Sequence, residues 1–320
     1  MGNIFCHIGN PKTFSTSIQL LLENYSKNDE INYLGFCPSQ KIGKWFSDST
    51  ISNIFDYSLM YESITSFNSN KYYYISYFQK QIEKCNNEKL DLWISSENLS
   101  CRFILEELDP LEKFSRIQKI LPSQTTFIIF FRNIFDSLMS IYSEYIKRGY
   151  VLSFEEFCQE TYLHRNSNFL QSFIPNNFIE TLKSELKNNN SLHAYLINDK
   201  KSVEHQLTEI FQKIYNFNNV QIPRKNVTTY NDEEFRIYNK NQKSLMTSSG
   251  MIEMHRAFWS LRDRDENQKL IWSQLKNNRE IRKRLKESRG KKMIEVFENT
   301  ELAKYLLKTN DRYILECMGK

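Results

Sequence analysis

Short apolar runs alternate with stretches of helical periodicity over the first 220 residues of the chain. The apolar runs have the length of buried strands, and the stretches between them repeat apolar residues every three or four positions, as sheet-covering helices do. This alternation predicts an α/β fold of three layers, with a mostly parallel sheet between helices. The predicted strands are 3–8, 31–36, 92–94, 125–131 and 192–199. The run 125–131 is apolar on both faces, which predicts a central strand.

The first apolar run ends in a loop that collects groups able to bind an anion. Gly9 and Pro11 break the run, and Lys12 follows with a cluster of hydroxyls ahead of an apolar helix. The start of a helix offers unpaired N–H groups and the positive end of its dipole, and a lysine adds a full charge. The hydroxyls, which also suit helix capping, belong to Thr13, Ser15, Thr16 and Ser17. A plain polar loop is the alternative, but the position between strand and helix favours an anion site.

This loop differs from the Walker A loop of nucleotide hydrolases. Walker A has a second glycine directly before its lysine, whereas Lys12 follows Gly9 after two residues and has no glycine beside it. A P-loop kinase or NTPase that binds ATP with magnesium is one alternative function for such a sheet and loop. The position of the lysine argues against it.

A carboxylate follows the predicted strand 92–94. The strand ends in Ser95, Ser96 and Glu97, and ligands of open α/β sheets bind at the carboxyl ends of strands. Glu97 therefore stands where a general base would accept the proton of a hydroxyl substrate. The alternative is that Ser96 or Glu97 only caps the next helix.

An arginine ends the apolar run 125–131. The planar guanidinium of Arg132 suits bidentate binding of phosphate, and Ser140 lies about two helical turns further along the next helix. We therefore expect Arg132 and Ser140 to bind one anion together. An ion pair between Arg132 and Asp136 is the alternative.

Segments 7–19 and 132–140 resemble two motifs of the sulfotransferases that use 3′-phosphoadenosine 5′-phosphosulfate (PAPS), bacterial and carbohydrate-type members especially. The first reads His-Ile-Gly-Asn-Pro-Lys-Thr-Phe-Ser-Thr-Ser-Ile-Gln and is similar to the family pattern His-Ile-Gly-x-Pro-Lys-Thr-Gly-Thr-Thr-Ser-Leu-Gln. The second keeps the Arg, Asp and Ser of the family pattern Arg-Asn/His-Pro-x-Asp-x-x-x-Ser, with Ile134 at the proline. Phe14 departs from the family glycine, and a bulky residue there can strain the loop or crowd the anion.

The resemblance implies a P-loop-like fold and transfer of a sulfuryl group from PAPS to a hydroxyl or amine, with 3′,5′-adenosine bisphosphate as product. It implies that Glu97 is the catalytic base, that Lys12 stabilises the charge of the transferred group, and that no metal is required. The residues expected to bind the sulfuryl donor PAPS are Lys12, Thr13, Phe14, Ser15, Thr16, Ser17, Arg132 and Ser140. Phe14 keeps another alternative open, a non-catalytic binding protein on the sulfotransferase fold.

Composition indicates the charge of the ligand and the compartment of the cell in which the protein works. The net charge of +5 suits an anionic ligand without requiring nucleic acid. The six cysteines form no Cys-x-x-Cys and no zinc spacing, which indicates free thiols of a reducing compartment. The chain shows no signal-peptide pattern and no long apolar segment, so we expect a cytoplasmic protein without a transmembrane segment. His7 falls within the first strand, where packing is a better interpretation than catalysis.

The resemblance covers about 230 residues, so we predict a sulfotransferase core of 1–230 and a helical C-terminal extension of 231–320 packed on it. The basic run 278–292 fits a solvated helical face, with contact to an anionic polymer or a membrane surface as the alternative. Aromatic residues within 45–78 suit an acceptor that stacks on them. A glycan or glycolipid is the first expectation for this acceptor, and the sequence leaves its identity and the oligomeric state open.

Overall fold

The computed structural model describes residues 2–10, 12–39, 46–100, 107–147, 152–187, 189–197, 202–223 and 291–309. The chain divides into two compact units, which are taken separately here. The first comprises Met1–Asn133 and Gln171–Val227, and the second comprises Ile134–Leu170 and Thr228–Lys320.

The predicted division of the chain at residue 230 stays a prediction. Residues 224–290 lie outside the described part, and with them lies almost all of the basic run 278–292. The described residues beyond that gap form two helices, α13 Lys291–Glu298 and α14 Glu301–Thr309.

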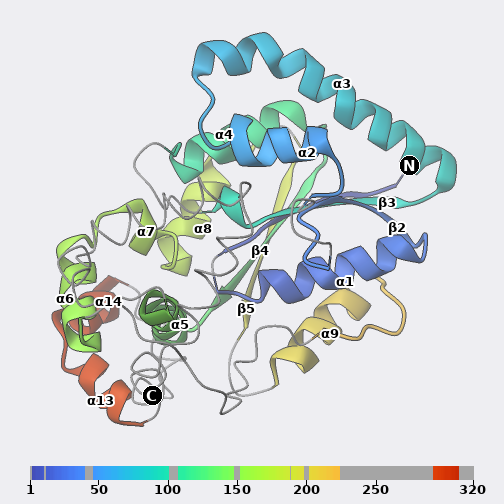
Figure 1. The fold of residues 1–320 in the computed structure, drawn as a ribbon. Coiled ribbons are helices and arrows are strands. Elements are labelled where there is room, and N and C mark those ends of the chain that lie inside the picture. The colour runs from blue at the N-terminus through green and yellow to red at the C-terminus, as the bar shows by residue number, and fades with distance from the viewer. Residues whose placement is uncertain are drawn as a thin grey trace, which may run out of the picture. The chain divides into compact units, whose positions relative to one another are not determined.

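A sheet of five parallel strands, in the order β2-β3-β1-β4-β5, forms the centre of the first unit (Figure 1). The strands are β1 Ile4–Ile8, β2 Ile31–Gly35, β3 Asp91–Ser96, β4 Thr126–Arg132 and β5 Ser191–Ile197. The predicted α/β class and parallel sheet are confirmed, and each predicted strand is found. The last two residues of the predicted strand 192–199 lie outside the described part.

Burial on both faces explains why β4 is an uninterrupted apolar run. Its five central side chains are at most 1 % exposed. Phe127, Ile129 and Phe131 belong to the core on one face of the sheet, and Ile128 and Phe130 belong to the core on the other. The prediction of a strand covered from both sides is confirmed.

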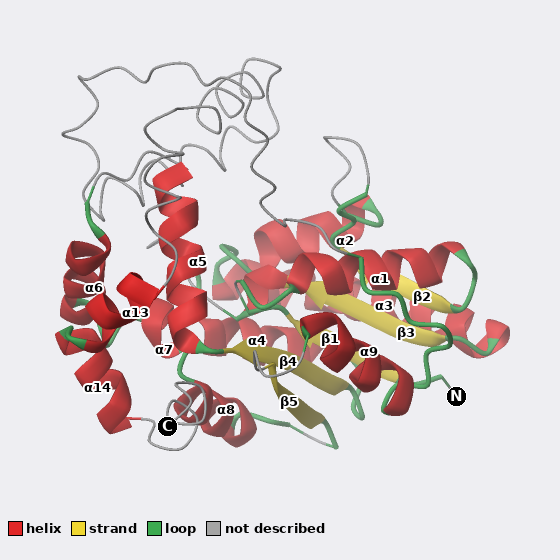
Figure 2. Ribbon diagram, turned by 90° about the horizontal axis from the view of Figure 1, so that it is seen from below, coloured by secondary structure: helices red, strands yellow, loops and turns green. Residues whose placement is uncertain are grey.

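Helices cover both faces of the sheet, which gives the predicted three layers (Figures 1 and 2). One face carries α1 Ser15–Lys27 and α9 Val203–Lys213, whose apolar residues join one core cluster with residues of β1, β3 and β4. The other face carries α3 Ile64–Glu88, α4 Pro110–Ile120 and α8 Pro175–Ser184, whose apolar residues join the second cluster. Apolar stripes at helical spacing therefore account for the layering.

Three short elements connect the strands on the α3 side. The helix α2 Ser49–Asn53 runs into a π-helix, η1 Ile54–Ser58, and a 3-10 helix, η2 Glu97–Leu99, directly follows β3. Pro110 occupies the first turn of α4, where its missing N–H costs nothing, and Asp109 caps that helix.

The chain leaves β1 and β3 toward opposite faces of the sheet. From β1 it enters α1, and from β3 it passes through η2 to α4 on the other face (Figure 1). The two strands are direct neighbours in the sheet. Ligands of open parallel sheets bind where neighbouring strands diverge in this way, at the carboxyl ends.

The second unit is helical in its described residues. It contains α5 Ile134–Lys147, α6 Phe154–Leu163, α13 and α14, while α7 Asn168–Gln171 lies at the boundary of the units. The ring of Phe135 contacts those of Phe154 and Phe297, with centroids 6.2 and 5.1 Å away. None of the described helices combines the length and the apolar character needed to cross a bilayer.

Candidate functional site

The loop after β1 alternates the handedness of its backbone. Lys12 and Phe14 adopt left-handed conformations with φ of 63° and 65°, and Thr13 between them does not. Successive residues of opposite hand form a concave anion-binding nest, in which the Thr13 N–H is already donated to Asn10 O at 3.3 Å. Pro11 lies outside the described residues. The loop geometry therefore agrees with the anion site expected from its composition.

The helix that follows this loop begins without a side-chain cap. Phe14 is the N-cap residue of α1, and the first turn is formed by Ser15, Thr16 and Ser17. The hydroxyls expected to precede and cap the helix thus lie inside it, which corrects that prediction. Ile18 N donates to Phe14 O at 3.0 Å, and helical geometry leaves the amides of the preceding turn without an intrahelical acceptor. These amides and the helix dipole favour a negative charge at this end of α1.

Two of the hydroxyls that were expected to bind PAPS form hydrogen bonds inside the loop instead. Thr13 Oγ1 and Ser15 Oγ donate to the main-chain oxygen of Asn10 at 2.6 and 3.1 Å, and both side chains are buried. Asn10 is itself anchored, since its Nδ2 donates to Ser172 O at 3.1 Å. Thr16 is partly exposed, whereas Ser17 is buried. The hydroxyls of Thr13 and Ser15 therefore hold the nest in shape, and Thr16 is more accessible than either.

Gly9 brings the loop against the end of β3. Its N–H donates to Ser96 O at 3.0 Å, and Ser100 Oγ donates to its oxygen. A Cβ atom built on Gly9 would lie 2.8 Å from the Cα of Glu97, closer than real Cβ contacts come. Glycine is required here so that the loop and Glu97 can approach each other.

Glu97 stands at the predicted place, where β3 ends and η2 begins. Ser96 Oγ accepts from Asn98 N at 3.2 Å and caps η2, so the capping role falls to Ser96. Burial raises the pKa of the Glu97 carboxyl, and the charge of Lys12 acts in the opposite direction. The candidate base and the candidate cation thus interact electrostatically. A carboxyl with a raised pKa is also a stronger proton acceptor when ionised.

Arg132 ends β4, where it pairs in register with Ile197 of β5. Its guanidinium carbon lies 5.3 Å from the ring centroid of Phe14, over the ring. Phe14 of the first motif and Arg132 of the second motif are therefore in contact, and Phe14 is the residue that departs from the family pattern. Ser140 and Asp136 lie on α5 in the second unit, so their pairing with Arg132 stays a prediction.

His7 is a packed strand residue, as expected. Its ring is fully buried beside Phe130, and Nδ1 lies 2.8 Å from Ser95 Oγ. Burial lowers the pKa of His7 to about 3, which keeps the imidazole neutral. The buried position in β1 confirms the packing interpretation.

Sequence reasoning missed a buried ion pair that supports Glu97. The ammonium group of Lys113, on α4, is fully buried and lies 3.0 Å from a carboxylate oxygen of Glu107. It also donates to Asn98 O, in the turn that begins at Glu97, at 2.9 Å. A signal existed in the sequence, because Lys113 shares the inward helical face of Ile117 and Ile120.

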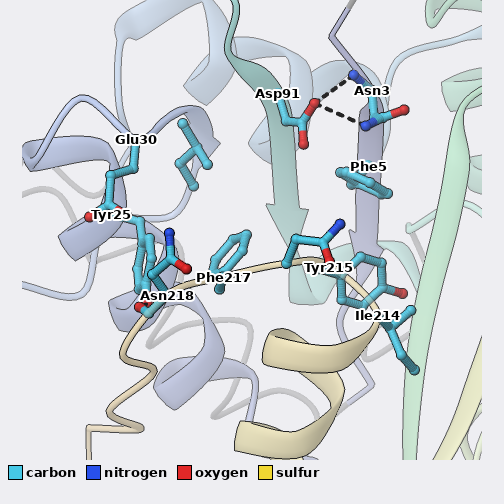
Figure 3. Close-up of a pocket in the computed structure, with 11 residues that line it drawn as sticks. Asn3, Phe5, Tyr25, Glu30, Asp91, Ile214, Tyr215, Phe217 and Asn218 are labelled. Atoms are coloured by element: carbon cyan, nitrogen blue, oxygen red, sulfur yellow. Dashed lines mark hydrogen bonds between the residues drawn. The ribbon is translucent and has the colours of Figure 1, made fainter.

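A pocket of about 350 Å³ lies at the opposite edge of the sheet, around the amino ends of β1, β2 and β3 (Figure 3). Phe5, Tyr215 and Phe217 line it together with the carboxylates of Glu30 and Asp91. Asn3 N and Nδ2 donate to Asp91 Oδ1 at 2.7 and 3.1 Å. None of the residues predicted for the donor site lines this pocket.

The described residues contain no cluster of three or more histidine, cysteine, aspartate or glutamate side chains able to hold a metal ion. Comparisons of the chain with protein-family models, with curated proteins and with solved structures find no significant match.

Proposed function

We propose that this protein is a PAPS-dependent sulfotransferase with a P-loop-like fold. The observation that carries the proposal is the gathering of three predicted groups around one loop. Lys12 interacts electrostatically with Glu97, and Phe14 of the same loop contacts Arg132. These groups come from the ends of three adjacent strands, β3, β1 and β4. The proposal also rests on the two sequence motifs that resemble the sulfotransferase family.

The donor end of the proposed site is the nest at residues 12–14 together with the start of α1. Amide groups, the helix dipole and the ammonium group of Lys12 suit a phosphosulfate, which carries negative charge on all its outer oxygens. Gly9 leaves room for this approach, since a Cβ atom there would meet Glu97. The residues present therefore fit the 5′-phosphosulfate of PAPS.

Arg132 is the proposed partner of the 3′-phosphate. Its guanidinium provides five N–H donors in one plane, a geometry that matches two phosphate oxygens. The spacing of the second motif assigns Ser140 to the same phosphate, and this assignment rests on sequence alone. ATP lacks a 3′-phosphate, so Arg132 would favour binding of PAPS over ATP.

The proposed chemistry is one displacement at sulfur. PAPS supplies an activated sulfuryl group bound to a phosphate oxygen. Glu97 accepts the proton of the acceptor hydroxyl as the new O–S bond forms, and the bond from sulfur to the phosphate oxygen breaks with its electron pair on that oxygen. Lys12 and the loop amides stabilise the charge that develops there. The products are the sulfated acceptor and 3′,5′-adenosine bisphosphate.

The proposed acceptor is a hydroxyl or amine of a glycan, a glycolipid or another small molecule. The exposed rings of Tyr57, Tyr61 and Tyr73 lie within or next to the segment expected to contact it. For the location we propose the cytoplasm. Four described cysteines are free and buried, which fits a reducing compartment: Cys6, Cys37, Cys85 and Cys158.

Calorimetric titration tests the proposal directly. The wild type is titrated with 3′,5′-adenosine bisphosphate and, separately, with ATP and magnesium. We expect saturable binding of the bisphosphate, weakened at least tenfold by Arg132→Ala, as the loss of a charge-assisted phosphate contact would produce. Lys84→Ala is the matched control, because Lys84 is an exposed cation on α3. No binding of the bisphosphate would overturn the proposal, and preference for ATP with magnesium would indicate a phosphotransferase.

Activity separates an enzyme from a binding protein on the same fold. Wild type, Glu97→Gln and Lys12→Ala are incubated with PAPS and a panel of hydroxyl-bearing glycans, and release of the bisphosphate is measured. We expect Glu97→Gln to bind the bisphosphate like wild type and to lose transfer by a factor on the order of 10²–10⁴. Tight bisphosphate binding without transfer by the wild type to any acceptor would favour the non-catalytic alternative.

A further inference from the structure

Phe14 occupies a backbone conformation that a glycine would adopt at no cost. Its φ of 65° and ψ of 14° are left-handed, a conformation that is strained for an L-residue with a side chain. Phe14 is also the N-cap residue of α1, a position where a short polar residue is usual. The side chain must make contacts that offset this strain.

The ring of Phe14 makes two such contacts. On one side it packs, partly buried, against the apolar cluster between α1 and the sheet, which contains Ile18 and Phe130. The Arg132 guanidinium lies over the ring, 5.3 Å from its centroid, within the range of about 6 Å for a cation–π contact. Such a contact is attractive and offsets part of the backbone strain.

A contact over an aromatic ring leaves the hydrogen-bonding geometry of arginine intact. The five N–H groups of a guanidinium lie in its plane, whereas a ring attracts the cation through the π face of the aromatic system. An arginine side chain also loses rotamer entropy when it is fixed on a phosphate. A ring that already restricts the guanidinium removes part of that loss before the ligand arrives.

We propose that Phe14 is a positioning residue that holds Arg132 ready for the 3′-phosphate of the nucleotide. The inference rests on the proposed function and deepens it. It gives a role to the residue that departs from the family glycine, and it links the loop at the 5′ end of the nucleotide with the arginine at the 3′ end. The opposite role, in which the ring shields Arg132 from phosphate, predicts the opposite effect of its removal.

Three variants and two nucleotides distinguish these roles in calorimetric titrations. Phe14→Tyr keeps an aromatic ring, Phe14→Leu keeps the apolar contact without the ring, and Arg132→Ala removes the cation. Each protein is titrated with 3′,5′-adenosine bisphosphate and with 5′-AMP, which lacks the 3′-phosphate. Circular dichroism and thermal unfolding verify that each variant is folded.

We expect Phe14→Leu to bind the bisphosphate about 5–30 fold more weakly, as the loss of one cation–π contact would cause. Phe14→Tyr should stay within about twofold of wild type, and both variants should bind 5′-AMP as wild type does. In the Arg132→Ala background, Phe14→Leu should have no further effect on bisphosphate affinity, because the coupled partner is gone.

Equal or tighter binding of the bisphosphate by Phe14→Leu overturns the inference, and tighter binding shows that the ring shields Arg132. An equal loss for both nucleotides also overturns it, because Phe14 then acts only through the shape of the loop. Failure of the wild type to bind the bisphosphate defeats the proposed function itself and the inference with it. The two failures are therefore distinguishable in one set of titrations.

Discussion

The ammonium group of Lys113 donates to the main-chain oxygen of Asn98 at 2.9 Å, directly beneath the turn that begins at Glu97. The same group lies 3.0 Å from Glu107 and is fully buried. A buried ammonium is tolerated only with such partners, since its desolvation costs several kcal/mol. The position of the candidate base therefore depends on a buried charge on a neighbouring helix.

Removal of this charge should destabilise the protein. We expect Lys113→Met to lower the free energy of unfolding by about 3–5 kcal/mol, because the variant loses the ammonium that contacts the buried carboxylate of Glu107 and the main-chain oxygen of Asn98. Urea unfolding followed by circular dichroism measures the change. Lys113→Met with Glu107→Gln should recover part of the loss, since the double variant removes both charges of the ion pair. A single variant as stable as wild type would contradict this role.

The ionised carboxylate of Glu97 should lower the free energy of unfolding at neutral pH. The pKa of Glu97 is raised in the folded state by burial, so ionisation of this carboxyl opposes folding above its unfolded pKa. We expect Glu97→Gln to be more stable than wild type at pH 7. The difference in the free energy of unfolding between this variant and wild type should shrink as the pH falls through the folded pKa of Glu97. The wild-type carboxyl then becomes neutral, as the amide of the variant already is. Urea unfolding at pH 7 and pH 4 measures both values, and a Gln variant less stable at pH 7 would contradict the expectation.

If Glu97 is the base of the proposed transfer, the same pKa shift should set the acid limb of the rate. Glu97 accepts a proton only when ionised, so the rate should fall as the pH decreases through its raised pKa. Lys12→Gln removes the charge that opposes the shift, and the limb should move to higher pH in this variant. Initial rates across pH 4–8 at saturating PAPS give both profiles. An acid limb that Lys12→Gln leaves in place would show that another group titrates.

The sheet could be predicted from sequence because the signals of its strands are local. β4 is a run of apolar residues that ends in Arg132, and β3 is a run that ends at Glu97. Binary pattern and turn residues suffice for such features. The helix after β1 was also predicted, although its first turn includes the hydroxyls that were expected to cap it.

The contacts that complete the site could not be predicted, because they join residues far apart in the chain. The approach of Phe14 to Arg132 depends on the parallel register of β1 with β4. The left-handed conformation of Phe14 contradicts the ordinary preference of a bulky residue, so propensity alone would place glycine there. The helical pattern of α4 indicates that Lys113 faces inward, but it does not identify Glu107 and Asn98 as the groups that the ammonium contacts.

Gly9 should tolerate no side chain. A Cβ atom there would lie 2.8 Å from Glu97 Cα and 3.1 Å from Ser15 Oγ, and the first of these is main chain that cannot rotate away. We expect Gly9→Ala to lower the free energy of unfolding by about 1–3 kcal/mol, as overpacking does. Displacement of Glu97 by about 1 Å should reduce transfer on the order of 100-fold. Bisphosphate affinity, unfolding and rate are measured together, and a variant with wild-type rate would contradict the predicted contact.

Buried His7 should make the protein sensitive to acid. Its pKa is lowered by burial from 6.5 to about 3, so the neutral ring supports folding fully above pH 6.5 and that support is lost as the pH falls toward 3. A shift of this size corresponds to about 4–5 kcal/mol over the whole range. His7→Asn keeps a polar atom near Ser95 Oγ and cannot titrate. The free energy of unfolding of this variant should therefore fall less steeply with decreasing pH, by as much as about 1.4 kcal/mol per pH unit.

The control for this experiment is His205→Asn. His205 is exposed on α9, where solvent screens its contact with Glu209 at 3.3 Å, so this variant controls for the exchange of a histidine for an asparagine at an exposed site. Urea unfolding between pH 4 and pH 7 compares the three proteins. The slope is the decisive quantity, since the smaller Asn side chain leaves a cavity that lowers stability at every pH. Equal slopes for wild type and His7→Asn would show that the ring is not held neutral by burial in β1.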